Sequence, residues 1–260
     1  MSILQSLPDV VAGIPDGSAV GLGGVLLKRK PMAAVAALAA AGRRDLRLFT
    51  FLGSVDVEAL VAAGAVAEVH GGYVGFEQLG FAPATKAAFE DGSVVFHEYS
   101  EFLFVAGLRA SLAGLPFMPA KGGAGSDLVG ELGIVEIADP YTGTPVLAVP
   151  ALRPDVTFIH AEASDAAGNV AGPSSPDFLW DFDAAIARAA GRVVVTVEEI
   201  VDSVAGRAML FAHEVDAVVL APGGAAPSAM PGRHPADLTR LRGYLADPAS
   251  GPGPLLGQPS

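Results

Sequence analysis

The chain has 260 residues, of which 51% are hydrophobic, so it can bury a sizeable core and cannot be disordered over most of its length. Its 28 acidic residues against 16 lysines and arginines give a formal net charge of −12, which argues against partners such as nucleic acid or an anionic membrane. It contains no cysteine, which excludes disulfides, thiolate nucleophiles and cysteine-type zinc sites.

The N-terminal segment carries Asp9 and Asp16 among apolar residues and has no basic start, so we predict no signal peptide. Every strongly apolar stretch is interrupted by glycine, proline or charge before it reaches membrane length. We therefore expect a soluble cytoplasmic protein. Only 17% of the residues are charged, which favours an oligomer in which another chain covers apolar surface.

Helices and buried strands are predicted to alternate along most of the chain. The expected helices are residues 5–13, 32–41, 57–63, 83–90, 101–113 and 179–190. The expected strands are residues 18–22, 46–51, 66–70, 94–98, 156–160, 193–198 and 217–220. This order predicts an α/β fold, an open, mostly parallel twisted sheet with flanking helices. Short apolar runs around a Pro-Tyr-Thr-Gly turn predict a small antiparallel extension within residues 134–149. We expect one domain over residues 1–247 and a flexible Gly/Pro-rich tail over 248–260.

A glycine turn follows the first predicted strand. Gly23 and Gly24 can let backbone N–H groups approach a ligand at the carboxyl end of the strand, where open α/β sheets bind ligands. Lys28, Arg29 and Lys30 come next, and they include two of the four lysines of this acidic chain. A local basic run favours an anionic ligand. The same residues also fit close packing of a helix on the sheet and a solvated turn.

Two glutamates lie at a later junction of strand and helix. Glu98 ends a predicted strand, Ser100 can cap the next helix, and Glu101 falls in its first turn. A carboxylate at this edge of the sheet can act as a nucleophile or base when it is partly desolvated. A structural role for Glu101 at the helix N-terminus explains the same pattern.

Three other polar segments give a weaker indication of function. A glycine-rich loop runs over residues 121–127, and an Asp-x-x-Gly-Asn turn runs over residues 165–169. Glu198 and Glu199 end a buried strand, and we expect one of them to order a neighbouring loop. The dinucleotide, Walker and nucleophile-elbow motifs are absent. The histidines show no ligand-like spacing, so no metal site is predicted; they are His70, His97, His160, His213 and His234.

Taken in order, these segments resemble the A (alpha) subunit of family I CoA-transferases, nearest to the glutaconate CoA-transferase alpha type. The similarity spans roughly residues 17–245. It is carried by residues 21–24, 29–33, 73–77, 98–101, 106–109, 115–117, 159–161, 165–169, 196–200 and 221–228.

The resemblance implies an open α/β fold and a partner B (beta) subunit, with an acyl-CoA and a carboxylic acid as substrates and no permanently bound cofactor. In such enzymes a glutamate attacks the thioester, forms an anhydride and then a glutamyl-CoA thioester, and coenzyme A passes to the acid acceptor. The classical nucleophile belongs to the B subunit. This chain has Gly53 and Ser54 at the corresponding place, so we expect it to be inactive alone.

The resemblance also suggests roles for individual residues. Gly23 and Gly24 would contact the oxyanion or the thioester carbonyl, and Glu98 and Glu101 would line the acyl pocket. Anionic parts of the substrate or coenzyme A would meet the basic turn or the glycine-rich loop with Lys121. The remaining predicted binding residues are Arg29, Ser54, Gly122 and Gly123.

Two alternatives remain open. Residues 29–32 also resemble the corresponding (alpha) chain of hydrolases that open the last rings of steroid degradation products as CoA thioesters, and those use a glutamate in the region of residues 98–101. Phe102 departs from the glycine found there. The related fold of sugar-phosphate isomerases and regulator domains suggests instead a sugar-phosphate-binding regulatory module, which would need no second subunit.

Overall fold

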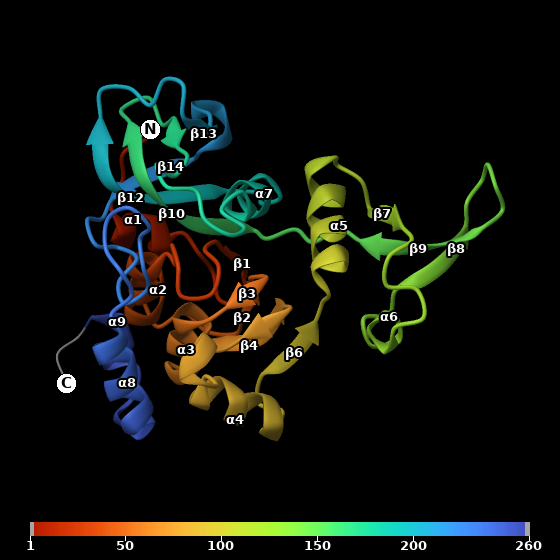
Figure 1. The fold of residues 1–260 in the computed structure, drawn as a ribbon, viewed down its shortest axis with the longest axis horizontal. Coiled ribbons are helices and arrows are strands. Elements are labelled where there is room, and N and C mark those ends of the chain that lie inside the picture. The colour runs from red at the N-terminus through yellow and green to blue at the C-terminus, as the bar shows by residue number, and fades with distance from the viewer. Residues whose placement is uncertain (1–2, 258–260) are drawn as a thin grey trace.

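Seven parallel strands form the body of the protein in the computed structural model, which describes residues 3–257 (Figure 1). Their order across the sheet is β14 (Ala217–Leu220), β12 (Val193–Val201), β10 (Val156–Asp165), β1 (Ala19–Leu22), β2 (Leu46–Phe49), β4 (Val66–Gly71) and β6 (Val95–Glu98). All four residues of β1 are buried, as expected for a parallel strand covered on both faces. The predicted parallel sheet is therefore confirmed.

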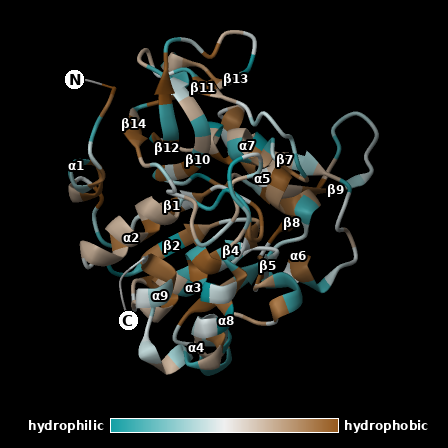
Figure 2. Ribbon diagram, turned by 60° about the vertical axis from the view of Figure 1, so that its left-hand side comes forward, coloured by the Kyte–Doolittle hydropathy of each residue, from teal (hydrophilic) through white to brown (hydrophobic). Residues whose placement is uncertain are grey.

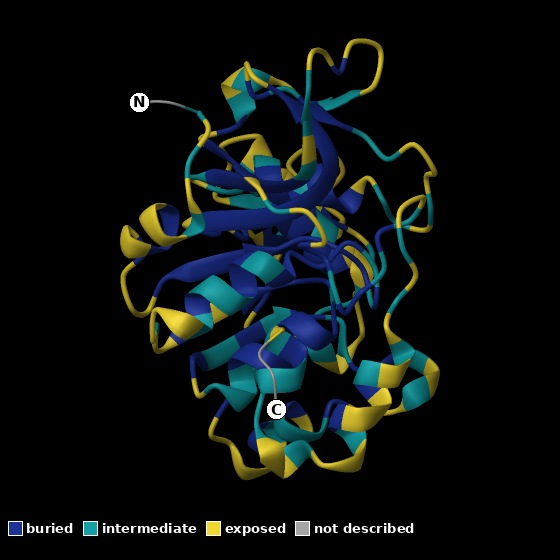
Figure 3. Ribbon diagram, turned by 90° about the vertical axis from the view of Figure 1, so that its left-hand side faces the viewer, coloured by how far each residue is buried: buried dark blue, intermediate teal, exposed yellow. Residues whose placement is uncertain are grey.

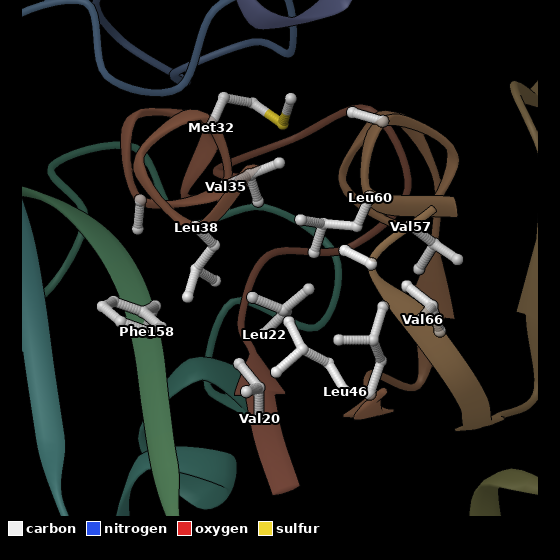
Figure 4. Close-up of a cluster of buried hydrophobic side chains, with 14 of the residues drawn as sticks. Val20, Leu22, Met32, Val35, Leu38, Leu46, Val57, Leu60, Val66 and Phe158 are labelled. Carbon is white, nitrogen blue, oxygen red and sulfur yellow. The ribbon is translucent and has the colours of Figure 1, made fainter. Parts of the chain in front are cut away.

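Two layers of helices cover this sheet. One face packs against α1 (Leu7–Ala12), α2 (Met32–Ala40), α3 (Val55–Ala62), α4 (Pro83–Asp91) and α8 (Leu238–Ala246). The other face packs against α5 (Glu101–Leu112) and α7 (Phe182–Arg188). Figure 4 shows the first core, where Leu38 and Leu60 of the helices face Leu22 and Leu46 of the strands. Buried and apolar residues follow the central strands in Figures 2 and 3.

A small antiparallel sheet extends from α5, away from the main sheet (Figure 1). It consists of β7 (Phe117–Ala120), β9 (Pro145–Pro150) and β8 (Val135–Ala138), with α6 (Asp127–Glu131) between β7 and β8. Its own core includes Leu103 and Ala106 of α5. The predicted antiparallel extension is confirmed, and β7 adds a strand that the sequence pattern did not indicate.

Several short elements complete the part of the chain that the structure describes. These are β3 (Leu52–Gly53), β5 (Tyr73–Val74), η1 (Glu77–Leu79), β11 (Val170–Ala171), β13 (Ala208–Leu210), η2 (Ala212–Glu214), η3 (Pro248–Ser250) and α9 (Gly253–Leu256). Strands β10 and β12 run further than predicted, and α7 is shorter. No helix within residues 3–257 has the length and apolar character needed to cross a bilayer.

The C-terminal segment differs from the expected flexible tail. Residues 248–257 form η3 and α9, and Leu255 is fully buried in the core shared with α2 and α3. A helix of four residues is too short to show a hydrophobic period, so its burial could not be read from the glycine and proline content. Residues 258–260 of the predicted tail lie outside the described residues.

A buried carboxylate joins three helices on this side of the sheet. Glu58 of α3 is fully buried and accepts hydrogen bonds from the backbone N–H groups of Ala84 and Thr85, both at 2.8 Å, and from the Thr85 hydroxyl at 2.7 Å. The Tyr244 hydroxyl of α8 donates to the same carboxylate. Burial and this hydrogen bond raise the pKa of Tyr244, so the phenol remains a donor. Glu58 thus holds the first turn of α4 and helix α8 to α3.

We expect Glu58→Gln to lower the free energy of unfolding by about 3 kcal/mol, because the amide faces four donors that need a carboxylate. Tyr244→Phe should cost about 1.5 kcal/mol, since it removes one hydrogen bond to a charged group. Urea denaturation measures both. Glu90→Gln, which removes an exposed partner of Lys86, is the matched control and should change stability by less than about 1 kcal/mol. Equal effects of Glu58→Gln and the control would contradict this role.

Candidate functional site

The glycine turn after β1 lies at the carboxyl edge of the sheet, as predicted, but its N–H groups are already bonded. Gly23 donates to the carbonyl of Phe158 at 2.9 Å, and Gly24 donates to the carboxylate of Asp183 at 2.6 Å. A Cβ at Gly23 would lie 2.7 Å from a methyl of Ile159, and Gly24 has a φ of +74°. The glycines therefore permit close packing, and the predicted oxyanion contacts of these two N–H groups do not fit this structure.

The basic turn is also directed inward. The Arg29 side chain is 2% exposed and forms ion pairs with Asp177 and, at 2.9 Å, with Asp183. Burial lowers the pKa of Arg29, but the two aspartates outweigh this and raise it above its ordinary value. The charge of Arg29 is thus neutralised within the chain, and its predicted contact with an anionic substrate stays a prediction.

Lys30 is completely buried behind the glycine turn. Its ammonium lies 3.0 Å from the Asp56 carboxylate and donates to the carbonyls of Gly24 and Leu52. Burial lowers the pKa of Lys30, and Asp56 opposes that shift. Of the three basic residues 28–30, only Lys28 is substantially exposed, and the exposed fraction of its side chain is 41%. Lys30 is thus a structural cation that fixes the turn.

Ser54 precedes α3 and is fully buried. Its backbone N–H donates to Asp56 at 2.7 Å, and its hydroxyl has no hydrogen-bond partner among the described residues. A fully buried side chain cannot contact a substrate in this conformation. The predicted binding role of Ser54 is not supported by its position.

Glu101 occupies an open position on α5. The Ser100 hydroxyl caps this helix by accepting from the N–H of Leu103, and Glu101, Val105 and Arg109 follow at intervals of four along one side. These three residues line two cavities, of about 480 and 230 Å³. Within residues 3–257 no hydrogen bond or ion pair engages the exposed Glu101 carboxylate. Glu101 is therefore accessible from solvent, and its predicted role in the acyl pocket stays a prediction.

The structure separates Glu98 from Glu101. Glu98 is exposed at the end of β6 and lines a different cavity, of about 300 Å³. Four aromatic side chains line that cavity, and Phe89 stacks on Phe96 in its wall with ring centroids 4.8 Å apart. The two glutamates do not line one shared pocket of this chain.

The glycine-rich loop packs on the start of α5. A Cβ at Gly122 would lie 2.8 Å from the ring of Phe102, and Gly123 has a φ of +91° beside Leu103. Phe102 is 52% exposed and lines the larger cavity together with Glu101. Gly122 therefore allows the loop to approach the wall of this cavity, and its predicted contact with a ligand stays a prediction.

A buried histidine and a glutamate form a second polar cluster, which the sequence did not indicate as a pair. His160 of β10 contacts Thr196 and Glu198 of β12, each at 2.8 Å, and Glu198 also accepts from the N–H of Gly223 at 2.7 Å. His234 lies 3.9 Å from Glu198. The hydrogen bond from His160, followed by that from Gly223, lowers the pKa of Glu198. Glu198 orders the loop after β14, as predicted.

One signal in the sequence could have found this cluster. His160 and Thr196 occupy equivalent positions on two apolar strands, and parallel pairing places them side by side. A single histidine or threonine within such a run predicts a partner on the neighbouring strand.

We expect Lys30→Met to reduce the free energy of unfolding by about 3 kcal/mol or more, because it leaves Asp56 buried without its counter-charge. Lys28→Met is the matched control: this lysine is largely exposed, so its loss should cost less than about 1 kcal/mol. Chemical denaturation of both variants measures the difference. If the two substitutions were equally mild, the buried cation would not be fixing the turn.

The lowered pKa of Glu198 predicts how the stability of the protein depends on pH. Its pKa in the folded protein lies below the ordinary value of 4.5, so its stabilising effect is complete above that pH and is lost as the pH falls through the folded-state pKa. The difference in unfolding free energy between wild type and Glu198→Gln should therefore shrink as the pH falls below 4.5. Denaturant titrations at a series of pH values test this, and a constant difference would contradict the assignment.

Comparison with known proteins identifies the family. The profile of the family described as coenzyme A transferase matches residues 4–215. The IpdA subunit of a cholesterol ring-cleaving hydrolase from Mycobacterium tuberculosis is 35% identical over 233 residues, covering 85% of this chain and 79% of the relative. An uncharacterized protein from Archaeoglobus fulgidus is 35% identical over 240 residues; the alignment covers 90% of this chain but only about half of that protein, 53%.

Solved structures agree with this relationship. A variant of the decarboxylase AibA/AibB matches with a TM-score of 0.90 and 37% identity over 99% of this chain and 98% of that chain. Glutaconate coenzyme A-transferase from Acidaminococcus fermentans matches with a TM-score of 0.85 and 30% identity over 94% of this chain and 83% of that one. The resemblance seen in the sequence is thereby confirmed, and the chain belongs to the coenzyme A transferase family.

Proposed function

We propose that this chain is the alpha-type (A) component of a heteromeric enzyme that transfers coenzyme A between an acyl-CoA and a carboxylic acid. The single observation that carries the proposal is the position of Glu101, an exposed carboxylate on the shared wall of two cavities beside α5. The family membership and the similarity to the corresponding chain of glutaconate CoA-transferase, at 30% identity, support this reaction class.

A partner chain would supply the nucleophile in this proposal. Ser54, which stands where a B subunit would carry its glutamate, is fully buried, and the N–H groups of Gly23 and Gly24 are occupied. Ser54 is therefore not available as a nucleophile, and the turn after β1 offers no free N–H group from Gly23 or Gly24 for an oxyanion. A glutamate of the B subunit would attack the thioester, while Glu101 and its cavities would receive the acyl group.

A second candidate is one component of an acyl-CoA hydrolase or decarboxylase. Glu101 has the exposure required of a general base or nucleophile in this chain itself, because no described cation or donor engages it. The relatives named IpdA and AibA/AibB, at 35% and 37% identity, favour this alternative. Phe102, which departs from the glycine of the ring-opening hydrolases, lines the same cavity as Glu101.

A sugar-phosphate-binding module is less consistent with the structure. The basic turn that could have bound a phosphate is neutralised by Asp56, Asp177 and Asp183, and both Arg29 and Lys30 are buried. A phosphate would have to displace these internal carboxylates.

The decisive experiment reconstitutes the chain with its B subunit and follows a panel of acyl-CoA thioesters with and without free acids. We expect coenzyme A to move to an acid, and hydroxylamine to trap a glutamyl-CoA thioester on the B subunit. Release of free coenzyme A, ring opening or loss of carbon dioxide without an acid acceptor would support the second candidate. Full activity of the isolated chain would contradict both.

Glu101→Gln tests the carboxylate within the reconstituted enzyme. If Glu101 is the general base of the second candidate, we expect turnover to fall at least about 100-fold. If it only lines the acyl cavity, as in the first candidate, the loss should be smaller. In both cases the melting temperature should stay unchanged, because the side chain is exposed and makes no ion pair within residues 3–257. Glu136→Gln, an exposed glutamate of β8, is the matched control and should retain activity. Wild-type turnover of Glu101→Gln would remove this residue from the mechanism.

A further inference from the structure

Two strands bring together polar side chains that are remote in the sequence. In β4, Glu68 and His70 are two residues apart and share one face of the sheet. The parallel register with β6 places His97 directly beside His70. Three potential metal ligands thus gather at one edge of the sheet, on the face opposite Val69, which packs in the core with α2 and α3.

The donor atoms of these side chains converge. The Nε2 atoms of His70 and His97 lie 3.2 and 3.5 Å from the same Glu68 oxygen, and the three ligand atoms are all within 4.8 Å of one another. Bonds of about 2.0–2.1 Å to a tetrahedral zinc ion place neighbouring ligand atoms about 3.4 Å apart. The two distances from the Glu68 oxygen therefore already match the ligand–ligand separation of a tetrahedral zinc site, without movement of the strands.

Packing holds one ligand in place and leaves another free to adjust. His70 is stacked on Phe49 on one side, with ring centroids 4.3 Å apart and planes within 5°. His97 stacks on the other side at 4.3 Å, with an interplanar angle of 15°. An ion in the plane of both rings needs one of them to turn about its Cβ–Cγ bond, and His97, with a third of its side chain exposed, is the one that can do so.

The cluster is open to solvent. The Glu68 side chain is 36% exposed, so a bound ion could complete its coordination with water. No lysine or arginine forms an ion pair with Glu68 in the described residues, and its ion-pair partners there are the two histidines. Two imidazoles and one carboxylate are a donor set typical of zinc and similar first-row divalent ions.

We propose that Glu68, His70 and His97 form a binding site for a divalent transition-metal ion of the zinc class. The ion would cross-link the edge strand β6 to β4. The site lies on different residues from the two α5 cavities that contain Glu101, so the proposal does not depend on the reaction that the enzyme catalyses.

The test uses the full chain after treatment with a chelator. Isothermal titration with Zn²⁺ should show binding of one ion per chain, and the melting temperature should rise with Zn²⁺ concentration. His97→Ala and Glu68→Gln should weaken binding by at least about tenfold, since even loss of an outer-shell partner costs about 10–100-fold. His213→Ala, which changes a histidine outside the cluster, is the matched control and should bind like wild type.

Nitrogen-15 NMR of the histidines provides a readout that does not rely on stability. Zn²⁺ should shift the Nε2 resonances of His70 and His97 together in wild type, and His70 should lose this shift or weaken it in His97→Ala. The proposal is overturned if the wild-type chain binds no Zn²⁺, if His97→Ala binds as tightly as wild type, or if the shifts occur on other histidines.

Discussion

The turn after β1 depends on the burial of two adjacent cations. Arg29 and Lys30 project from one short loop, and each is neutralised by aspartates from other parts of the chain, Asp183 and Asp177 for the first and Asp56 for the second. Because an unpaired charge in this position would be very costly, the loop, the start of α3 and the segment before α7 must adopt their positions together. These ion pairs tie the three segments together at the carboxyl edge of the sheet.

The same interaction explains why the accessible chemistry lies elsewhere. The N–H groups of Gly23 and Gly24 are bonded to the Phe158 carbonyl and the Asp183 carboxylate, so the turn is part of the support of the site. The open carboxylate belongs to α5, which the sheet and the small extension clamp from two sides. The exposed carboxylate therefore lies on a helix that is held on two sides by packed cores.

Much of the fold could be predicted because its signals are local. Buried strands such as residues 217–220 and the helix that begins after Pro31 carry their pattern within a few residues. The burial of Arg29 could not be predicted, since its partners lie about 150 residues further along the chain. The place of Glu101 in the first turn of α5 could be predicted from the local sequence, whereas the clustering of His70 with His97 requires the pairing of β4 with β6.

The antiparallel extension leaves and rejoins the body of the protein at neighbouring points, because Phe117 at its start pairs with Pro150 at its end. Between these points the extension pairs only with its own strands, and its buried side chains pack on α5. Met118, Pro119 and Ala120, at the base of this insertion, belong to the wall of the larger cavity. A change in this insertion can thus reshape the rim of that cavity while the register of the parallel sheet beneath it stays the same.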